Sequence, residues 1–350
     1  MTEVLRVDPD NPDPESIARA AEALRRGELV AFPTETVYGV GVHALDRAAV
    51  RRLFEAKQRP STDPLIVHVA SIDAVTPLVD AMPPAARALA ERFWPGPLTI
   101  VLPKSDRVPD EVTAGLPTVA VRVPSHAVAH GILEAARIPI AAPSANLFSR
   151  PSATQASHVL EDLNGRVDLI VDGGSTDVGV ESTVIDLSGS IPTLLRPGAI
   201  DLDALRTVVP NVARRDASAV DAAMPSPGML SKHYSPRAPL TMYDGERAAA
   251  LARMVHDIRA LIERHQLITV LVFAEDAADL RRTGARIVEL GSEREPADIA
   301  ARLYAALREC DHTAPDAIVA RMLTTPHPLT PAIRDRLRRA AAGRVVALGT

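Results

Sequence analysis

The chain has 350 residues, 47% of them hydrophobic, and a formal net charge of −5 at pH 7. This length allows two domains, and this apolar fraction supplies enough material for packed cores, which excludes a wholly disordered protein. The acidic balance argues against a protein that holds nucleic acid through a general basic field, so any contact with RNA would have to be local or transient.

Cysteine content and hydropathy exclude further classes of protein. The single cysteine, Cys310, cannot form an internal disulfide, and no Cys/His spacing is typical of a zinc site. The N-terminus is acidic and interrupted by prolines, unlike a signal peptide, and no apolar run reaches the ~18 residues of a membrane-spanning helix. We therefore expect a soluble cytoplasmic protein without membrane contact and without a metal site of its own.

The N-terminal part of the chain predicts alternating helices and strands. Asp13 begins a helix, and a strand over 29–32 leads into a polar turn that ends in two glycines. A second helix begins at Asp46 and ends near Lys57, and the apolar stretch 64–69 is typical of a buried strand.

Further strands follow up to about residue 195, with two more helices between them. The strands are expected at 98–102, 119–123, 138–142, 169–171, 184–187 and 193–195, and the helices at 126–136 and 154–163. Some connections are too short for a crossover helix, so residues 1–208 are predicted to form a twisted mixed sheet flanked by helices.

The pattern changes after residue 208. Residues 209–238 have little periodicity and several prolines, which is typical of a linker. From 239 to 350 strands and helices alternate regularly. Strands are expected near 239–243, 268–273, 286–290 and 316–320, and helices near 246–264, 296–309 and 331–340. This pattern predicts a smaller, mostly parallel, Rossmann-like α/β domain.

Polar side chains cluster directly after the strand at 29–32. Pro33 ends the strand, and Thr34, Glu35, Thr36 and Tyr38 follow it. A plain strand-turn-strand connection explains this composition, but loops on rigid strands also carry binding groups. The stretch alone favours the plain connection.

Two cations follow the second helix. In one interpretation Lys57 and Arg59 interact favourably with the negative end of the dipole of the preceding helix. In the other they bind phosphates, lysine as a point charge and arginine through two parallel hydrogen bonds. Spacing alone favours the first interpretation, that the two cations stabilise the C-terminus of the helix.

Polar residues also lie on or after two apolar strands. Ser144 and Asn146 follow the strand at 138–142, where open α/β sheets bind ligands, although a Ser/Asn turn explains them as well. Arg122 lies inside the apolar strand 119–123. A buried arginine needs an anion, either a protein carboxylate or a ligand, and we favour a ligand carboxylate.

The remaining clusters indicate no metal site and no nucleophilic triad. The glycine-rich stretch 172–183 is not a Walker loop, because no Gly-Lys-Ser/Thr follows, and it is not a dinucleotide fingerprint, because a strand and not a helix comes next. His126 and His130 lack a nearby carboxylate, and His68 alone is typical of a core histidine. Cations, hydroxyls and a buried arginine suit a protein that binds a nucleotide and a small carboxylate and that catalyses by positioning and charge stabilisation.

Several ordered motifs together resemble the Sua5/YrdC family of L-threonylcarbamoyladenylate synthases. The motifs are Pro33–Gly39 (PTETVYG), Ala56–Pro60 (AKQRP), Pro64–His68 (PLIVH), Trp94–Thr99 (WPGPLT), Ala142–Asn146 (APSAN), Glu181–Val184 (ESTV) and Leu195–Gly198 (LRPG). Residues 226–229 (SPGM) with His233 and Tyr234 resemble the longer, two-domain Sua5 form. The resemblance covers most of residues 15–236.

This resemblance implies a YrdC-like catalytic domain, a lid formed by 209–238 and a Sua5 C-terminal domain. It also implies a nucleotidyltransferase that converts L-threonine, bicarbonate or CO2, and ATP with Mg2+ into threonylcarbamoyl-AMP and pyrophosphate. The product would pass to the machinery that modifies adenosine 37 of tRNA with a threonylcarbamoyl group.

The same resemblance implies the site residues. Those expected to bind L-threonine are Thr36, His68, Arg122, Ala142 and Ser182. Those expected to bind ATP are Arg59, Asp63, Thr118, Ser144, Asn146, Ser152, Arg196 and Tyr234, with Lys57 and Arg59 as the catalytic cations. Many relatives carry Asn at the position of Asp63. The aspartate of this chain therefore puts a carboxylate near the expected phosphates. An alternative hypothesis is a YrdC-like RNA-binding factor without catalysis of its own.

Overall fold

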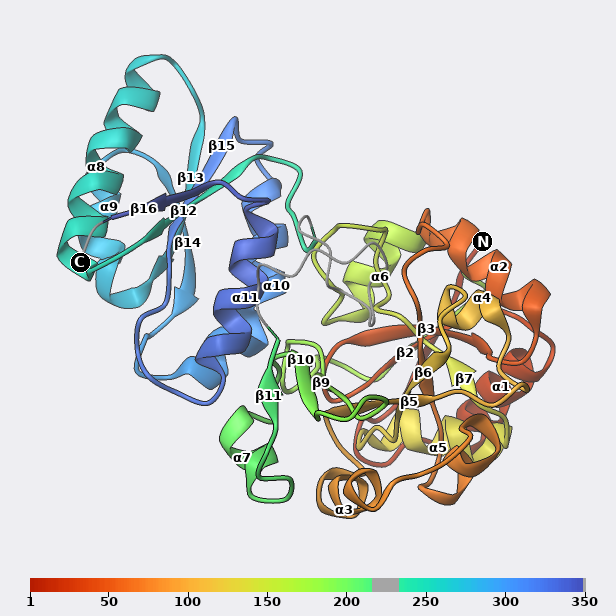
Figure 1. Cartoon of the computed structure of the whole chain (residues 1–350). Coiled ribbons are helices and arrows are strands. Elements are labelled where there is room, and N and C mark those ends of the chain that lie inside the picture. The colour runs from red at the N-terminus through yellow and green to blue at the C-terminus, as the bar shows by residue number, and fades with distance from the viewer. Residues whose placement is uncertain (216–232, 349–350) are drawn as a thin grey trace. The chain divides into compact units, whose positions relative to one another are not determined.

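The computed structural model describes residues 1–215 and 233–348, which divide into two compact units (Figure 1). Residues 1–148 and 152–215 form the first unit, and residues 149–151 and 233–348 belong to the second. Most of the expected lid and the motif at 226–229 lie outside the described residues. Residues 233–238 belong to the second unit.

Within residues 1–215, eleven strands form one sheet in the order β1-β8-β2-β3-β7-β4-β6-β5-β9-β10-β11. The strands are β1 (Glu3–Arg6), β2 (Val30–Pro33), β3 (Tyr38–His43), β4 (Ile66–His68), β5 (Leu98–Pro103), β6 (Thr118–Arg122), β7 (Ile140–Ala141), β8 (Leu169–Asp172), β9 (Thr183–Asp186), β10 (Thr193–Arg196) and β11 (Ala213–Arg214). Strand β6 pairs in parallel with β4 and antiparallel with β5. The prediction of a mixed sheet is therefore confirmed.

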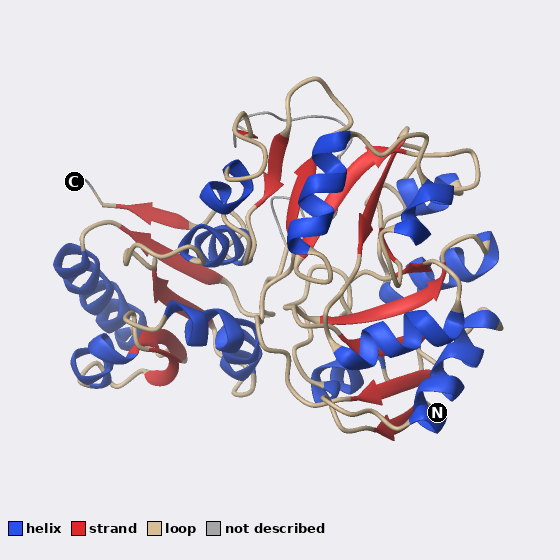
Figure 2. Ribbon diagram, turned by 90° about the horizontal axis from the view of Figure 1, so that it is seen from below, coloured by secondary structure: helices blue, strands red, loops and turns tan. Residues whose placement is uncertain are grey.

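Helices lie on both sides of the strands (Figure 2). They are α1 (Pro14–Arg25), α2 (Arg47–Lys57), the 3-10 helix η1 (Asp73–Leu78), α3 (Pro84–Phe93), α4 (Asp110–Thr113), α5 (Ala127–Ala136), α6 (Ala156–Leu163) and α7 (Leu202–Arg206). Asp13 caps α1 by accepting from the Ser16 backbone N–H, and Asp46 caps α2, as the sequence predicts. Helix α2 ends at Gln58, whose φ of 53° is left-handed.

The two faces of this sheet are covered unequally. Helices α2, α3, α6 and α7 contribute to the large core cluster on one face. On the opposite face α1 and α5 pack over β2, β7 and β8. The rest of that face, over β4, β6, β5 and β9, holds a small apolar cluster of Ile66, Val101, Ala120, Val184 and Leu195. No helix of the α1 and α5 cluster covers this part of the sheet, so polar side chains can lie there.

The connection between β8 and β9 shows that the sheet curls. These strands are consecutive in the chain but seven strand-to-strand steps apart in the sheet, or about 34 Å if it were flat. Residues 173–182 would need an almost fully extended chain to span this. Gly174 and Gly179, however, have left-handed φ values of 81° and 72°. The strong twist of the sheet must therefore bring β8 and β9 closer together.

The second unit is built on a five-stranded sheet in the order β14-β13-β15-β12-β16, counted within residues 233–348. All its pairings are parallel, so a Rossmann-like α/β arrangement is confirmed. Its elements are β12 (Leu240–Asp244), α8 (Arg247–Glu263), β13 (Ile268–Phe273), η2 (Ala274–Asp276), α9 (Ala277–Arg281), β14 (Arg286–Gly291), α10 (Pro296–Asp311), β15 (Ala317–Arg321), α11 (Thr330–Ala340) and β16 (Val345–Ala347).

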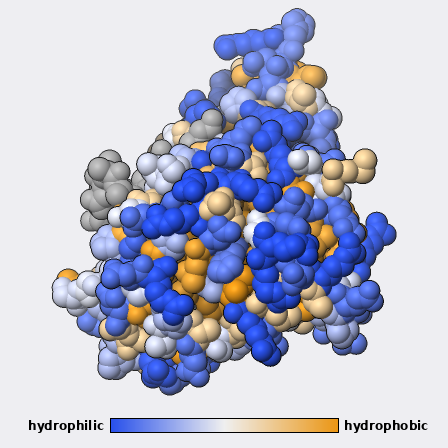
Figure 3. Space-filling model, turned by 90° about the vertical axis from the view of Figure 1, so that its right-hand side faces the viewer, coloured by the Kyte–Doolittle hydropathy of each residue, from blue (hydrophilic) through white to orange (hydrophobic). Residues whose placement is uncertain are grey.

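The surface carries few large hydrophobic side chains. Among the described residues, those that are exposed are Met1, Ile191, Leu267 and Val345. The face at the right of Figure 1 is covered mainly by hydrophilic residues, with hydrophobic patches between them (Figure 3). In residues 1–215 and 233–348, no helix is both long and apolar enough to cross a membrane.

Candidate active site

Polar side chains gather on the face of β4, β6, β5 and β9 that α1 and α5 leave uncovered. Side chains alternate along a strand, so His68 points to the same side as Ile66, and Arg122 to the same side as Ala120. By the same rule Thr99 and Ser182 share this face. His68 and Arg122 are paired in register, and neighbouring strands lie about 4.8 Å apart. The four side chains therefore form a row across adjacent strands.

Arg122 is the buried centre of this row. Its Nη1 donates to Thr36 Oγ1 at 2.9 Å and its Nε to the Gly96 carbonyl at 3.2 Å. Its Nη2 lies 2.8 Å from Glu35 Oε2, and both side chains are more than 90% buried. The sequence analysis favoured a ligand carboxylate as the anion that Arg122 needs. In the structure one protein carboxylate, that of Glu35, already faces Arg122, and binding of a ligand carboxylate beside it stays a prediction.

The turn between β2 and β3 brings Glu35 and Thr36 to Arg122. Thr34 Oγ1 donates to the Val37 carbonyl at 2.7 Å and lies 2.8 Å from Thr36 Oγ1, which closes the turn on itself. The backbone N–H of Val178 donates to the Glu35 carbonyl at 2.9 Å. The loop 173–182 therefore holds the turn from the other side.

Burial and the charge of Arg122 set the protonation of two neighbours. Burial raises the pKa of Glu35, but attraction to Arg122 and hydrogen bonds outweigh it, leaving this pKa below its ordinary value. Burial, and then repulsion from Arg122, lower the pKa of His68 to about 3. At neutral pH the site thus holds an ionised pair and a neutral imidazole.

Ser182 links the row to a second buried arginine. Its Oγ lies 2.8 Å from Thr99 Oγ1 and accepts from Arg196 Nη2 at 3.1 Å. Arg196 Nε also donates to the Ser182 carbonyl at 3.1 Å. The next residue, Thr183, donates its N–H to the Pro97 carbonyl. These contacts place Ser182 beside the corner at 94–97, whose Gly96 carbonyl holds Arg122.

Lys57 supports the loop that follows β7. Its buried Nζ donates to the carbonyls of Ser144 and Asn146. Burial, and then repulsion from Arg59, place its pKa well below the ordinary value of a lysine. The ammonium group of Lys57 is therefore buried, and it points neither to solvent at the end of α2 nor out of the protein. It fixes the backbone that carries two expected nucleotide-binding residues.

Arg59 and Asp63 form a buried ion pair. Arg59 Nη2 lies 2.9 Å from Asp63 Oδ2, and both side chains are 3% exposed. Arg59 also donates to the carbonyls of Asp63 and Pro64. The carboxylate that the sequence places near the expected phosphates is thus paired with the neighbouring guanidinium.

The other predicted residues occupy separate places. Ser152 donates to Glu181 Oε1 at 2.5 Å, and the Ala142 N–H donates to the Ile66 carbonyl. Thr118 begins β6, four residues and about 13 Å along the strand from Arg122 but on the same face. Tyr234 belongs to the second unit, where its ring lies 5.3 Å from that of Tyr304.

Three buried residues that contact the predicted set were not predicted as site residues. They are Glu35, Thr99 and Glu181. Each lies inside one of the sequence motifs, so the motifs themselves were the available signal. Among the described residues, no group of three or more His, Cys, Asp or Glu side chains is placed to hold a metal ion.

Family models match both units of the chain. The Sua5/YciO/YrdC model, described as telomere recombination, matches residues 22–198. A second model, described as the C-terminal domain of threonylcarbamoyl-AMP synthase, matches residues 200–342.

Individual relatives match nearly the whole chain. A threonylcarbamoyl-AMP synthase of Pyrococcus abyssi is 44% identical, over 93% of this chain and 94% of its own length. A protein of the same name from Bacillus subtilis is 43% identical, over 95% of each chain. The crystal structure of P. abyssi Sua5 complexed with L-threonine superposes with a TM-score of 0.92 and 40% identity, covering 99% of this chain and 100% of that one.

Proposed function

This chain belongs to the Sua5/YrdC family, and from that premise we propose that it is an L-threonylcarbamoyladenylate synthase. It would act as a nucleotidyltransferase, joining L-threonine, CO2 from bicarbonate and ATP into threonylcarbamoyl-AMP and pyrophosphate. The observation that carries the proposal is 44% identity to a synthase of this name over 93% of the chain. The product would feed the modification of tRNA adenosine 37.

Arg122 is the proposed anchor for the carboxylate of L-threonine. A guanidinium has five N–H donors, and Glu35, Thr36 and Gly96 engage only part of them. The amino acid would bind the remaining N–H groups and lie among Thr36, His68, Ala142 and Ser182. The P. abyssi relative complexed with L-threonine supports this substrate.

The nucleotide is proposed to extend from this pocket over the apolar strand face toward Thr118. Arg59 and Arg196 supply guanidinium groups, and Ser152 supplies a hydroxyl. Ser144 and Asn146 lie on the loop that Lys57 holds, so Lys57 would act through that loop. Asp63 would orient Arg59 through their ion pair. Mg2+ would arrive bound to the phosphates of ATP, because it usually keeps water and phosphate ligands.

The proposed reaction has two steps. The neutral amine of threonine attacks the carbon of CO2, forming a C–N bond and, after loss of a proton, a carbamate. A carbamate oxygen then attacks the α-phosphorus of ATP, and the bond to the β-phosphate oxygen breaks as pyrophosphate leaves with the electron pair. Negative charge gathers at this phosphorus, so fixed guanidinium groups beside it lower the barrier.

The deciding experiment measures pyrophosphate release from ATP. We expect release only when L-threonine, bicarbonate and Mg2+ are all present. Absence of release with any divalent metal would refute the proposal. If the chain instead bound tRNA tightly and in a salt-sensitive manner without releasing pyrophosphate, the RNA-binding alternative would replace it.

A further inference from the structure

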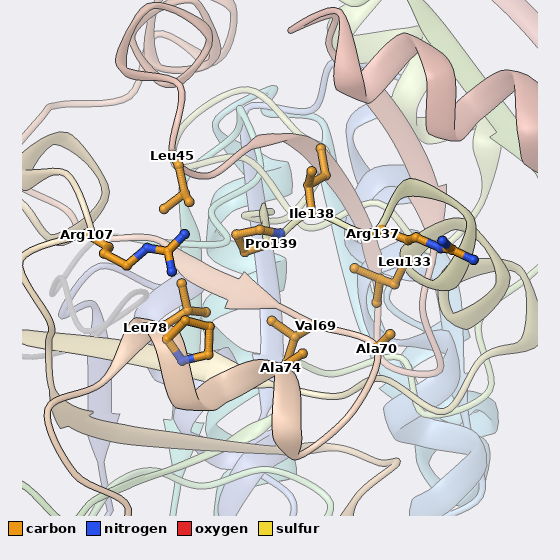
Figure 4. A pocket seen from close by; sticks show the side chains of 11 residues that line it. Leu45, Val69, Ala70, Ala74, Leu78, Arg107, Leu133, Arg137, Ile138 and Pro139 are labelled. Carbon is orange, nitrogen blue, oxygen red and sulfur yellow. The ribbon is translucent and has the colours of Figure 1, made fainter.

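A cavity of about 370 Å³ lies in the first unit, and no residue of the candidate active site lines it. Its walls come from the turn after β3, the segment after β4, helix η1, and the end of α5 with the turn into β7. Figure 4 shows Leu45, Val69, Leu78, Leu133 and Ile138 around it. This volume falls within the range of about 300–1,000 Å³ typical of small-molecule sites.

The chemistry of the lining restricts what the cavity can hold. Apart from two arginines, every lining side chain is aliphatic or proline, so no lining side chain carries a hydroxyl, amide or carboxylate. An amino group would find no side-chain acceptor there, and the many hydroxyls of a sugar would find only the two arginines as side-chain donors. The cavity therefore suits a ligand with an aliphatic body, and it does not suit threonine or a nucleotide.

One charged group distinguishes the cavity from a plain apolar hollow. Arg107, from the connection between β5 and α4, directs its guanidinium toward the centre, whereas that of Arg137 points away (Figure 4). Within residues 1–215 and 233–348, Arg107 and its neighbour Asp106 form no hydrogen bond or ion pair through their side chains. The guanidinium is thus available to a ligand anion, which it binds best as a bidentate carboxylate.

We propose that this cavity binds a small aliphatic carboxylate, with its hydrocarbon body against Val69, Leu78 and Ile138 and its carboxylate on Arg107. The inference does not depend on the proposed synthase activity. The site is nevertheless continuous with the active-site strands, because the Val69 N–H donates to the Arg122 carbonyl at 3.0 Å.

The test is calorimetric titration of the full chain with octanoate, with octanamide and acetate as partial probes. We expect octanoate to bind one to one, and the uncharged octanamide and the short acetate to bind at least about tenfold more weakly. Arg107→Gln should weaken octanoate binding about tenfold or more and leave octanamide unchanged. Arg166→Gln, a matched change outside the cavity, should change neither.

A second variant tests the cavity itself. Ala74→Phe places a ring in the hollow and should abolish binding of both eight-carbon probes, while the thermal midpoint confirms folding. Arg107 is exposed, so Arg107→Gln should fold normally. Its affinity for octanoate therefore tests the proposal even if Ala74→Phe does not fold. The proposal is overturned if wild-type chain does not bind octanoate, if octanamide binds equally well, or if Arg107→Gln leaves octanoate affinity unchanged.

Discussion

Each unit of this chain buries an arginine at the end of a strand, and the two arginines are neutralised differently. Arg122 ends β6 and faces one carboxylate, that of Glu35, with Thr36 and Gly96 as neutral acceptors. Arg321 ends β15 and faces two carboxylates, those of Asp276 and Glu293, each through two of its N–H groups.

The two arginines differ in whether any N–H donors remain for a further anion. We call the Arg321 ion-pair network closed because no donor remains, whereas Arg122 keeps some. The two carboxylates and the Met322 carbonyl engage all five N–H groups of Arg321. Its guanidinium also lies 4.8 Å from the centre of the Phe273 ring, and Arg247 pairs with the same Asp276. No N–H group of Arg321 is left there for a further anion. Arg122 has a single carboxylate partner, so a second anion meets a positive group with N–H donors to spare. The contrast predicts a structural role for Arg321 and a binding role for Arg122.

The largest effect should come from breaking the closed network. Arg321→Met leaves the buried Glu293 without its arginine and leaves Asp276 with Arg247 alone, and removing one partner of a buried ion pair costs about 3–5 kcal/mol in free energy of unfolding. Urea denaturation followed by circular dichroism should show this loss. The single tryptophan, Trp94, lies in the first unit, so its fluorescence transition should stay at the wild-type urea concentration.

A matched variant in the same unit gives the scale. Arg253 pairs with Asp257 on the surface of α8, and such an exposed pair contributes about 0.3–0.5 kcal/mol. Arg253→Met should therefore barely move the transition. Equal losses in the two variants would show that the Arg321 network does not stabilise the second unit.

The next effect should be on ligand affinity. Arg122→Met removes the proposed carboxylate anchor, and a charged hydrogen-bonded contact is worth about 1.5–3 kcal/mol, or roughly 10–150-fold in affinity. We expect L-threonine binding to weaken by this factor in calorimetric titration, while a non-hydrolysable ATP analogue keeps its affinity.

Arg321→Met is the control for that experiment, since it removes an equally buried arginine from the other unit. Under conditions where it stays folded, its affinity for L-threonine should match the wild type. Parallel loss of threonine and nucleotide binding in Arg122→Met would contradict the assignment of Arg122 to the amino acid.

The sequence predicted the longer strands and the family but not the shortest strands. Periodicity located β13 at Ile268–Phe273 as predicted, and the ordered motifs identified the family. Short elements that depend on tertiary pairing, such as β1 and β16, were missed, because isolated two- to four-residue strands have little pattern of their own.

Partners across the fold could not be read from the sequence. Glu35 and Arg122 are 87 positions apart, and they meet only because the sheet curls and the turn after β2 folds over its face. The same holds for Lys57, whose contacts lie on a loop almost ninety residues later. Spacing along a chain identifies which residue types are present, but packing decides which of them face each other.

His68 offers the smallest and most local test of the Arg122 region. Its folded pKa of about 3 lies below the unfolded value of about 6.5. Between these values the unfolded chain binds a proton that the folded chain does not. The free energy of unfolding should therefore fall as pH falls from 6.5, by up to about 1.4 kcal/mol per pH unit from this group.

The measurement is urea denaturation followed by Trp94 fluorescence at pH 6.5, 5.5 and 4.5. His68→Gln keeps a neutral polar side chain at this position, so it should reduce the slope of unfolding free energy against pH. The ion pair of Glu35 with Arg122 begins to lose its contribution near pH 4.5, the ordinary pKa of Glu, but it does so in wild type and His68→Gln alike, so the difference between their slopes reports His68. An unchanged slope in His68→Gln would mean that His68 becomes protonated in the folded chain, and so that burial and the charge of Arg122 do not keep its imidazole neutral.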